Sequence, residues 1–191
     1  MNFVTRFLNS IPMYRITLYY VGALWLIAVA LGFLGMLPFT GISIAVSGVF
    51  LMGVCGLISD IFAKIFVLPE NHESALITAL ILTLIVPPVT VLSDFWFLAT
   101  VATIAMSSKY IIAIKGKHIF NPAAVAVAIT ALIIGRSATW WVGTAVMLPF
   151  VFAGGILLTK KIRRFDAVLA FVPGRTSFCG SPEESGKTLL V

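Results

Sequence analysis

The sequence predicts an all-α protein: a polytopic membrane helix bundle of about six transmembrane helices with a cytoplasmic N-terminus. Three observations lead to this fold class. The 191-residue chain is 60% hydrophobic and 10% charged, whereas soluble domains contain about 25% charged residues. Its apolar residues fall into long runs separated by short polar connections. Its positive charge is concentrated in alternate connections, as expected of helices that cross a bilayer back and forth.

Six apolar runs are candidate spans. A spanning helix needs about 20 apolar residues at about 1.5 Å rise each. Three runs reach this length and three are shorter, one of them with Pro87 and Pro88 near its end. In chain order the predicted spans are residues 16–37, 40–59, 75–91, 95–108, 121–135 and 140–159. The first run is too long for the apolar part of a signal peptide, so we expect an uncleaved span.

The basic residues predict the orientation. If the N-terminus is cytoplasmic, 12 of the 13 basic residues lie in inside segments, and Arg136 alone lies in an outside connection. The chain is therefore expected in the plasma (inner) membrane as a multi-pass protein, and its pI of 9.6 requires no nucleic-acid partner. No charged residue or histidine lies near the middle of any predicted span, which argues against a proton relay of side chains.

The stretch SSKYIIAIKGKHIFNPAAVAVAI, residues 107–129, places cations directly before a helix start. Asn121 is a good N-cap, and Pro122 suits the first helical position. The N–H groups of this helix start, together with Lys115 and Lys117, predict a site for a phosphate or for a partner's carboxylate. The simpler interpretation, which the spacing alone favours, is that Asn121 only caps the helix and the lysines only orient it.

No other pattern predicts a catalytic residue or a metal site. Cys55 and Cys179 match no disulfide, CxxC or metal-binding spacing. His72 is expected in a solvated cytoplasmic turn, with Ser74 or Asn71 as N-cap of the next helix. The sequence also contains no Gly-rich phosphate loop in a strand–helix context and no nucleophile–base pair that the spacing supports.

Three sequence elements occur in an informative order: ESALITALILTLIVPP at 73–88, SKYIIAIKGKHIFNPAAV at 108–125, and KKIRRFDAVLAF at 160–171. They resemble the "SALxTxLLLAxxxPP" span, the "KxxxxGxGxNxFNPA" element and the basic loop of the NqrB/RnfD family. This family is the membrane subunit shared by the Rnf electron-transport complex and the sodium-translocating NADH:quinone reductase. In the second element Lys109, Gly116 and the residues 120–123 are in register. The chain is similar to the N-terminal half of the family, from about Arg15 to Phe171.

The resemblance implies an integral membrane subunit of an ion-translocating, flavin-dependent electron-transport complex, and not a catalyst on its own. It implies FMN or riboflavin as cofactor, and as partners the lipid bilayer and the other membrane and peripheral subunits of such a complex. Family members with covalent FMN carry it on a threonine in a "[ST]-x-A-T" element within an extramembrane insertion. Here the connection is only GRSAT, residues 135–139, so Thr139 is not assigned as a flavin anchor and no covalent flavin site is predicted.

The chain is expected to consist of a transmembrane domain, residues 1–171, and a polar tail, residues 172–191, whose Ser-, Gly- and Pro-rich composition predicts disorder. Too few apolar residues precede Pro173 for a seventh span. This indicates a truncated or frame-shifted form of a longer family member, or a natural short version. Two alternatives to electron transport stay open: a small-solute channel or transporter with a single Asn-Pro-Ala helix start and Pro-interrupted spans, and an inactive remnant.

Overall fold

The structure is a computed structural model that describes residues 13–66, 72–111, 113–114, 117–118, 120–136 and 138–162. The chain forms two compact units, Met1–Gly154 and Gly155–Val191. The helix bundle described below belongs to the first unit. Of the second unit, the described residues are the last turns of one helix. The predicted polar tail, 172–191, lies outside the described residues.

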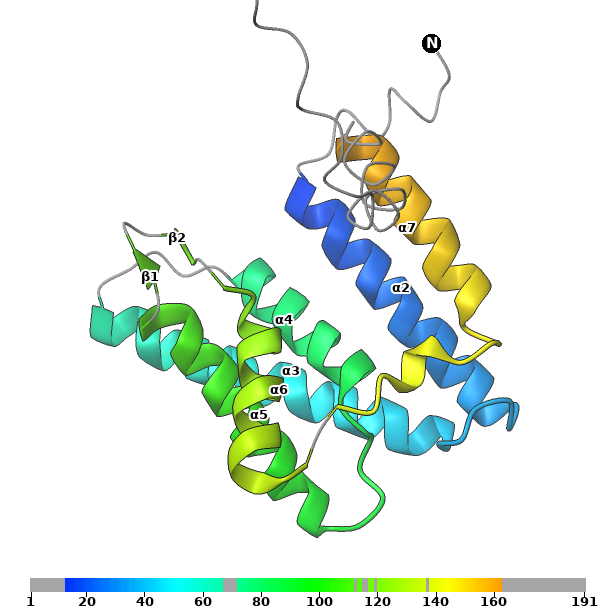
Figure 1. The fold of residues 1–191 in the computed structure, drawn as a ribbon, viewed down its shortest axis with the longest axis horizontal. Helices are drawn as coiled ribbons and strands as arrows, with labels where there is room; N and C mark the ends of the chain where they lie inside the picture. Colours follow the sequence, from blue (N-terminus) through cyan, green and yellow to red (C-terminus); the bar gives the residue numbers. More distant parts are fainter. Residues whose placement is uncertain are drawn as a thin grey trace, which may run out of the picture. The chain divides into compact units, whose positions relative to one another are not determined.

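Six α-helices make up most of the described chain, which confirms the predicted all-α class. In chain order they are α2 (Met13–Phe33), α3 (Gly41–Phe66), α4 (His72–Ile85), α5 (Ser93–Ile111), α6 (Pro122–Ile134) and α7 (Leu148–Ile162) (Figure 1). Between α5 and α6 two short strands, β1 (Ala113–Ile114) and β2 (Lys117–His118), form an antiparallel pair that was not predicted. A single 3-10 turn, η1 (Trp141–Gly143), precedes α7.

The third and sixth predicted spans had wrong boundaries. Helix α4 ends at Ile85 instead of residue 91, because Pro87 and Pro88 have no N–H to continue the helical hydrogen bonds. Helix α7 begins at residue 148 instead of 140. Trp140 has a left-handed backbone with φ of 46°, which a right-handed helix cannot contain.

Helix α4 lies between two hydrophobic clusters. One face of α4 contributes Ala75, Ala79 and Leu82 to a cluster with α3, α5 and α6. Another face contributes Leu80 and Leu84 to a cluster with α2, the first half of α3 and the segment around η1. Helix α3 packs against α2, α4 and α5, while α6 packs chiefly against α5 (Figure 1). Half of the residues of the 14-residue helix α4 are therefore buried.

One close approach explains a glycine in α3. The indole of Trp25 on α2 lies directly over Gly48, so that a Cβ at this position would collide with its Nε1. The same indole N–H donates to the Ile44 carbonyl oxygen at 3.3 Å. The missing side chain thus lets α2 and α3 approach closely, as small residues do at helix–helix contacts.

Side-chain contacts bring the starts of α2 and α4 and the ends of α3 and α5 together at one end of the bundle. These contacts are Arg15 Nε–Glu73 Oε1 at 2.9 Å, His72 Nδ1–Asp60 Oδ1 at 3.4 Å and Ser59 Oγ–Tyr110 OH at 2.8 Å. We call this the Lys109 end, after the residue that precedes Tyr110. The opposite end, with the start of α5 and the end of α6, is called the Asp94 end.

His72 was expected in a solvated turn between the second and third spans. Its side chain is exposed, as expected, but the residue is the first of α4 and approaches Asp60 on α3. Ser74 lies inside the first turn of α4, so it is not the N-cap. Asn71, the other N-cap predicted from the sequence, lies outside the described residues.

Candidate functional site

Asn121 caps α6 as predicted. Its backbone is extended, with φ of −66° and ψ of 118°, and its side-chain Oδ1 accepts a hydrogen bond from the Ala123 N–H at 3.1 Å. Pro122 occupies the first position of the helix. At the other end of α6, Gly135 has the left-handed backbone (φ 70°) that commonly ends a helix. The helix start predicted from Asn-Pro-Ala is confirmed.

The same cap reduces the number of backbone N–H groups that could bind an anion at this helix start. Pro122 has no N–H, and the Ala123 N–H is bonded to the cap itself. The Val125 N–H donates to the Asn121 carbonyl oxygen at 3.1 Å. The first turn therefore leaves only the Ala124 N–H without a partner among the described residues, where a helix start has up to four unpaired N–H groups.

The two lysines of the predicted anion site are not placed by the structure. Lys115 lies outside the described residues. The backbone of Lys117 belongs to β2, where it pairs with Ile114, but its side chain is not among the described parts. The anion site of Lys115, Lys117 and Asn121 therefore stays a prediction.

A different lysine at this end is deeply buried. Lys109, in the last turn of α5, is 8% exposed, and its Nζ makes no hydrogen bond within the described part of the chain. The ammonium lies 5.7 Å from the centroid of the Tyr110 ring. In the sequence Lys109 is in register with a family element, but no role was predicted for it. A buried ammonium without hydrogen bonds is unfavourable, so Lys109 is expected to lower the stability of the Lys109 end.

At the Asp94 end, the break of α4 leaves carbonyl oxygens without their helical N–H donors. In an uninterrupted helix, the N–H groups of residues 87 and 88 would bond the carbonyl oxygens of Thr83 and Leu84. Both positions are proline, and Val89 donates its N–H to Ser47 Oγ of α3 at 2.8 Å. The carbonyl groups in the last turn of α4 therefore need other donors, because an unpaired buried carbonyl is costly.

The segment 139–141 supplies three of these donors. The indole N–H of Trp141 donates to the carbonyl oxygens of Thr83 at 3.1 Å and Val86 at 3.0 Å. The backbone N–H groups of Thr139 and Trp140 both donate to the Ile85 carbonyl oxygen at 3.2 Å. The left-handed backbone of Trp140 lies within this segment, so the strain coincides with the capping of α4.

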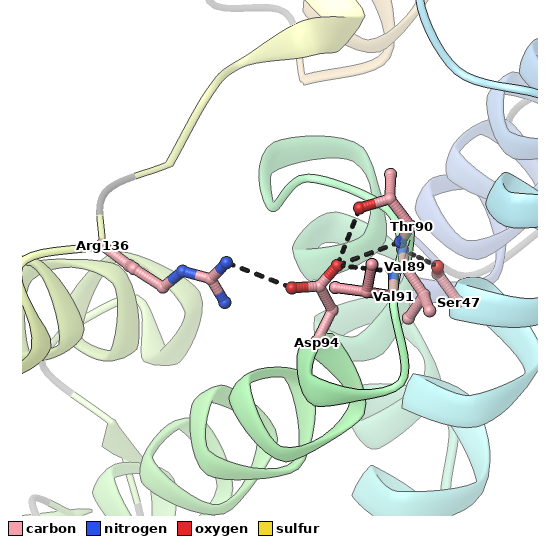
Figure 2. A network of polar contacts seen from close by, with 6 residues as sticks. All are labelled: Ser47, Val89, Thr90, Val91, Asp94 and Arg136. Atoms are coloured by element: carbon pink, nitrogen blue, oxygen red, sulfur yellow. Dashed lines mark hydrogen bonds and ion pairs between the residues drawn. The ribbon is translucent and has the colours of Figure 1, made fainter.

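The carboxylate of Asp94 holds the loop that follows the prolines. Its Oδ2 accepts hydrogen bonds from the Thr90 N–H at 3.0 Å, the Val91 N–H at 3.1 Å and the Thr90 hydroxyl at 2.9 Å (Figure 2). Its Oδ1 accepts from Nη2 of Arg136 at 3.1 Å. The Arg136 guanidinium also lies 5.0 Å above the centroid of the Phe97 ring. Asp94 is 7% exposed, so this is a buried carboxylate with both oxygens hydrogen-bonded.

These donors set the protonation state of Asp94, which lies just outside the predicted span 95–108. The hydrogen bond from the Thr90 backbone lowers the pKa of Asp94 to about 2, assisted by the Val91 N–H, the Thr90 hydroxyl and Arg136, and opposed by burial. The carboxylate is therefore ionised at any physiological pH.

A cavity of about 120 Å³ adjoins this network. Its apolar walls are Phe39, Pro87, Pro88 and Phe97. Its polar groups are Thr90, Asp94 and Arg136. This site was not predicted from the sequence. The signal that could have found it is Arg136, the single basic residue in a predicted outside connection.

Comparison with known proteins supplies no further assignment: no protein-family profile, no curated protein and no solved structure matches this chain.

Proposed function

We propose that the chain is an integral, multi-pass subunit of an ion-translocating, flavin-dependent electron-transport complex of the Rnf/Nqr type, in the plasma membrane. The observation that carries the proposal is the position of the two motifs that resemble this family. The element ending in Pro87-Pro88 coincides with α4 and its break, and Asn121-Pro122 coincides with the start of α6. Each motif therefore has a physical role at a helix end.

The distribution of charge and apolar surface supports the membrane part of the proposal. Helices α2 and α3 are long and apolar enough to cross a bilayer, yet only 22% and 33% of their apolar stretches are buried inside the protein. A core helix of a soluble protein would be mostly buried. Large apolar side chains also face outward elsewhere, including Leu132 at 86% and Trp96 at 80% exposure. Lipid is the solvent that such a surface needs.

The shorter helices fit the same proposal. Helices α4 and α6 have 14 and 13 residues, which gives lengths of about 20 Å, less than the ~30 Å of a bilayer core. The charged side chains in the described helices lie at or near helix ends. In the proposal, the segments after α4 and α6 complete the crossing. The N–H groups of residues 89–91, 139 and 140 are hydrogen-bonded within the protein, as such a position requires.

A flavin does not fit the cavity of the Asp94 end. Pockets for cofactors are typically about 300–1,000 Å³, and this cavity is about 120 Å³. Among the described residues, the capped start of α6 offers one free N–H in its first turn. No flavin contact and no step of electron transfer is therefore assigned to the described residues.

The experiment is purification of the full chain from its native membranes in a mild detergent. The proposal expects other membrane and peripheral redox subunits in the eluate, together with flavin that acid precipitation releases, because no covalent anchor is assigned. Reporter fusions after residue 116 and after residue 136 are expected on the cytoplasmic and opposite sides. Purification without redox subunits and without flavin, or both reporters on one side, would contradict the proposal.

A second candidate function is a small-solute channel or transporter. It is favoured by the break of α4 at Pro87-Pro88 beside a cavity that contains Asp94 and Arg136, since interrupted helices mark the binding sites of many transporters. Flux into liposomes that contain only the purified chain distinguishes the two candidates. A redox subunit alone is expected to leave the liposomes tight to small solutes.

A further inference from the structure

We propose that the cavity at the Asp94 end binds a small, uncharged amide, such as a primary carboxamide with a short alkyl group, between Asp94 and Arg136. The inference rests on the geometry of this cavity and does not depend on a role in electron transport. Its failure would therefore leave the proposed function in place.

The room in the cavity limits the ligand to a few atoms. A protein cavity of roughly 150 Å³ holds one benzene molecule, and the cavity here measures about 120 Å³. A molecule of benzene size or smaller therefore fits, and a nucleotide or a flavin does not. Phe39, Pro87 and Pro88 provide apolar walls for the alkyl part of such a ligand.

On the polar side of the cavity, Asp94 can accept a further hydrogen bond and Arg136 can donate further ones. Oδ2 of Asp94 already accepts three hydrogen bonds, but Oδ1 accepts only the one from Arg136 Nη2. A carboxylate oxygen has room for a second donor. The guanidinium has five N–H donors, of which one is used within the described part of the chain. Figure 2 shows the Asp94 carboxylate facing the Arg136 guanidinium. A primary amide has both an N–H donor for the carboxylate and a carbonyl acceptor for the guanidinium.

The charge of the cavity selects a neutral ligand. Asp94 and Arg136 form an ion pair at 3.1 Å with no net charge. A cation would have to compete with Arg136 for the carboxylate, and an anion would have to compete with Asp94 for the guanidinium. A neutral ligand gains hydrogen bonds to both charged groups without separating them, and such bonds are stronger than those between neutral groups.

The walls of the cavity are held from three sides, so the site exists before a ligand arrives. The loop at Thr90 is bonded to Asp94, and the Val89 N–H is bonded to Ser47 of α3. Arg136 is packed on Phe97. Preformed sites lose less entropy on binding, which matters for a ligand of so few atoms.

The test uses three isosteric probes, acetamide, acetate and acetamidinium, with the full chain in lipid nanodiscs. Binding is measured by saturation-transfer difference NMR. Acetamide is expected to give the strongest transfer, and acetate and acetamidinium little. In Arg136→Met the acetamide affinity is expected to fall roughly tenfold, since a charge-assisted hydrogen bond is lost. The matched control is Arg15→Met, which removes the Arg15–Glu73 pair at the Lys109 end and is expected to leave the affinity unchanged.

Each other outcome overturns the proposal. Stronger transfer from acetate or acetamidinium would show that the site selects charge. Equal transfer in Arg136→Met and Arg15→Met would show that acetamide binds elsewhere, and no transfer would show that the cavity holds only water. If Arg136→Met does not fold, Arg136→Lys keeps the ion pair but loses the planar set of donors. It is expected to bind acetamide more weakly than the wild-type chain.

Discussion

The buried charges at the two ends of the helix bundle differ in their hydrogen bonding. At the Asp94 end, a carboxylate that is 7% exposed accepts four hydrogen bonds, one of them from Arg136. At the Lys109 end, an ammonium that is 8% exposed has no hydrogen-bond partner among the described residues. Similar burial thus accompanies a complete network in one place and an incomplete one in the other. A complete network contributes to stability, whereas a buried charge without partners opposes it.

This difference indicates a structural role for the Asp94 network, whereas the described residues give no structural role to Lys109. The Asp94 network serves the fold itself, because the carboxylate accepts hydrogen bonds from the N–H groups of the loop that follows the double proline. Lys109 has no such task in the described chain. Its charge is compatible with the proposed function, in which neighbouring subunits meet the bundle, but the folding of this chain gains nothing visible from it.

The largest effect is expected from Asp94→Ala. The substitution frees the N–H groups of Thr90 and Val91 and leaves Arg136 without its partner, so the free energy of unfolding should fall by about 3 kcal/mol. Reversible unfolding in mixed micelles measures the change. Glu73→Ala is the control, because it removes an ion pair with solvent-exposed side chains, for which a loss below about 1 kcal/mol is expected. Equal losses would remove the distinction between the two ends.

Trp141→Phe tests the capping of α4 separately from the charges. An aromatic side chain is kept, but the N–H that serves Thr83 and Val86 is lost and the smaller phenyl ring fills less of this buried position. The free energy of unfolding should therefore fall by about 2 kcal/mol. Trp140→Phe is the matched control, since this neighbouring side chain is 64% exposed and its indole has no such task. A Trp140→Phe loss as large as that of Trp141→Phe would mean that the aromatic surface, not the hydrogen bond, stabilises this end.

Acid should weaken the Asp94 end selectively. The pKa of Asp94 lies at about 2 in the folded protein, below its ordinary value of 3.8. The stabilisation is therefore complete above the ordinary value and is lost as the pH falls toward 2. The free energy of unfolding is expected to decrease by about 2 kcal/mol over this range. Thermal unfolding of the wild-type chain and of Asp94→Asn at pH 5 and pH 2.5 measures the effect, and the variant should lack this part of the pH dependence.

The smallest effect, of opposite sign, is expected at the other end. Lys109→Met replaces a buried ammonium that has no hydrogen-bond partner among the described residues by an apolar side chain of similar length. It should raise the free energy of unfolding by about 1 kcal/mol. Lys64→Met, at an exposed position in the last turn of α3, should be nearly neutral. Destabilisation of the isolated chain by Lys109→Met would show that the ammonium has a partner within this chain after all.

The helices and their order could be predicted from the sequence because apolar runs, prolines and charges act locally. Asn121-Pro122 starts a helix as expected, since a cap depends on residues two or three positions away. The Asp94 network could not be predicted in this way. Trp141 and Thr83 are 58 positions apart, and Arg136 and Asp94 are 42 apart. No periodicity links such residues, and only the packing of α4, α5 and α6 brings them together.

The end of α4 depends on hydrogen-bond donors from residues 139–141, and this has a consequence for biosynthesis. A nascent chain that has grown only through α6 carries bare carbonyl groups at Thr83 and Val86, because their donor Trp141 has not yet been translated. In the proposed multi-pass subunit, the C-terminal turn of α4 would until then be unfavourable in hydrocarbon. On that proposal, stalled or prematurely terminated chains are expected to remain with the insertion machinery or be degraded, and release into the bilayer is expected to follow the synthesis of the Trp140-Trp141 pair.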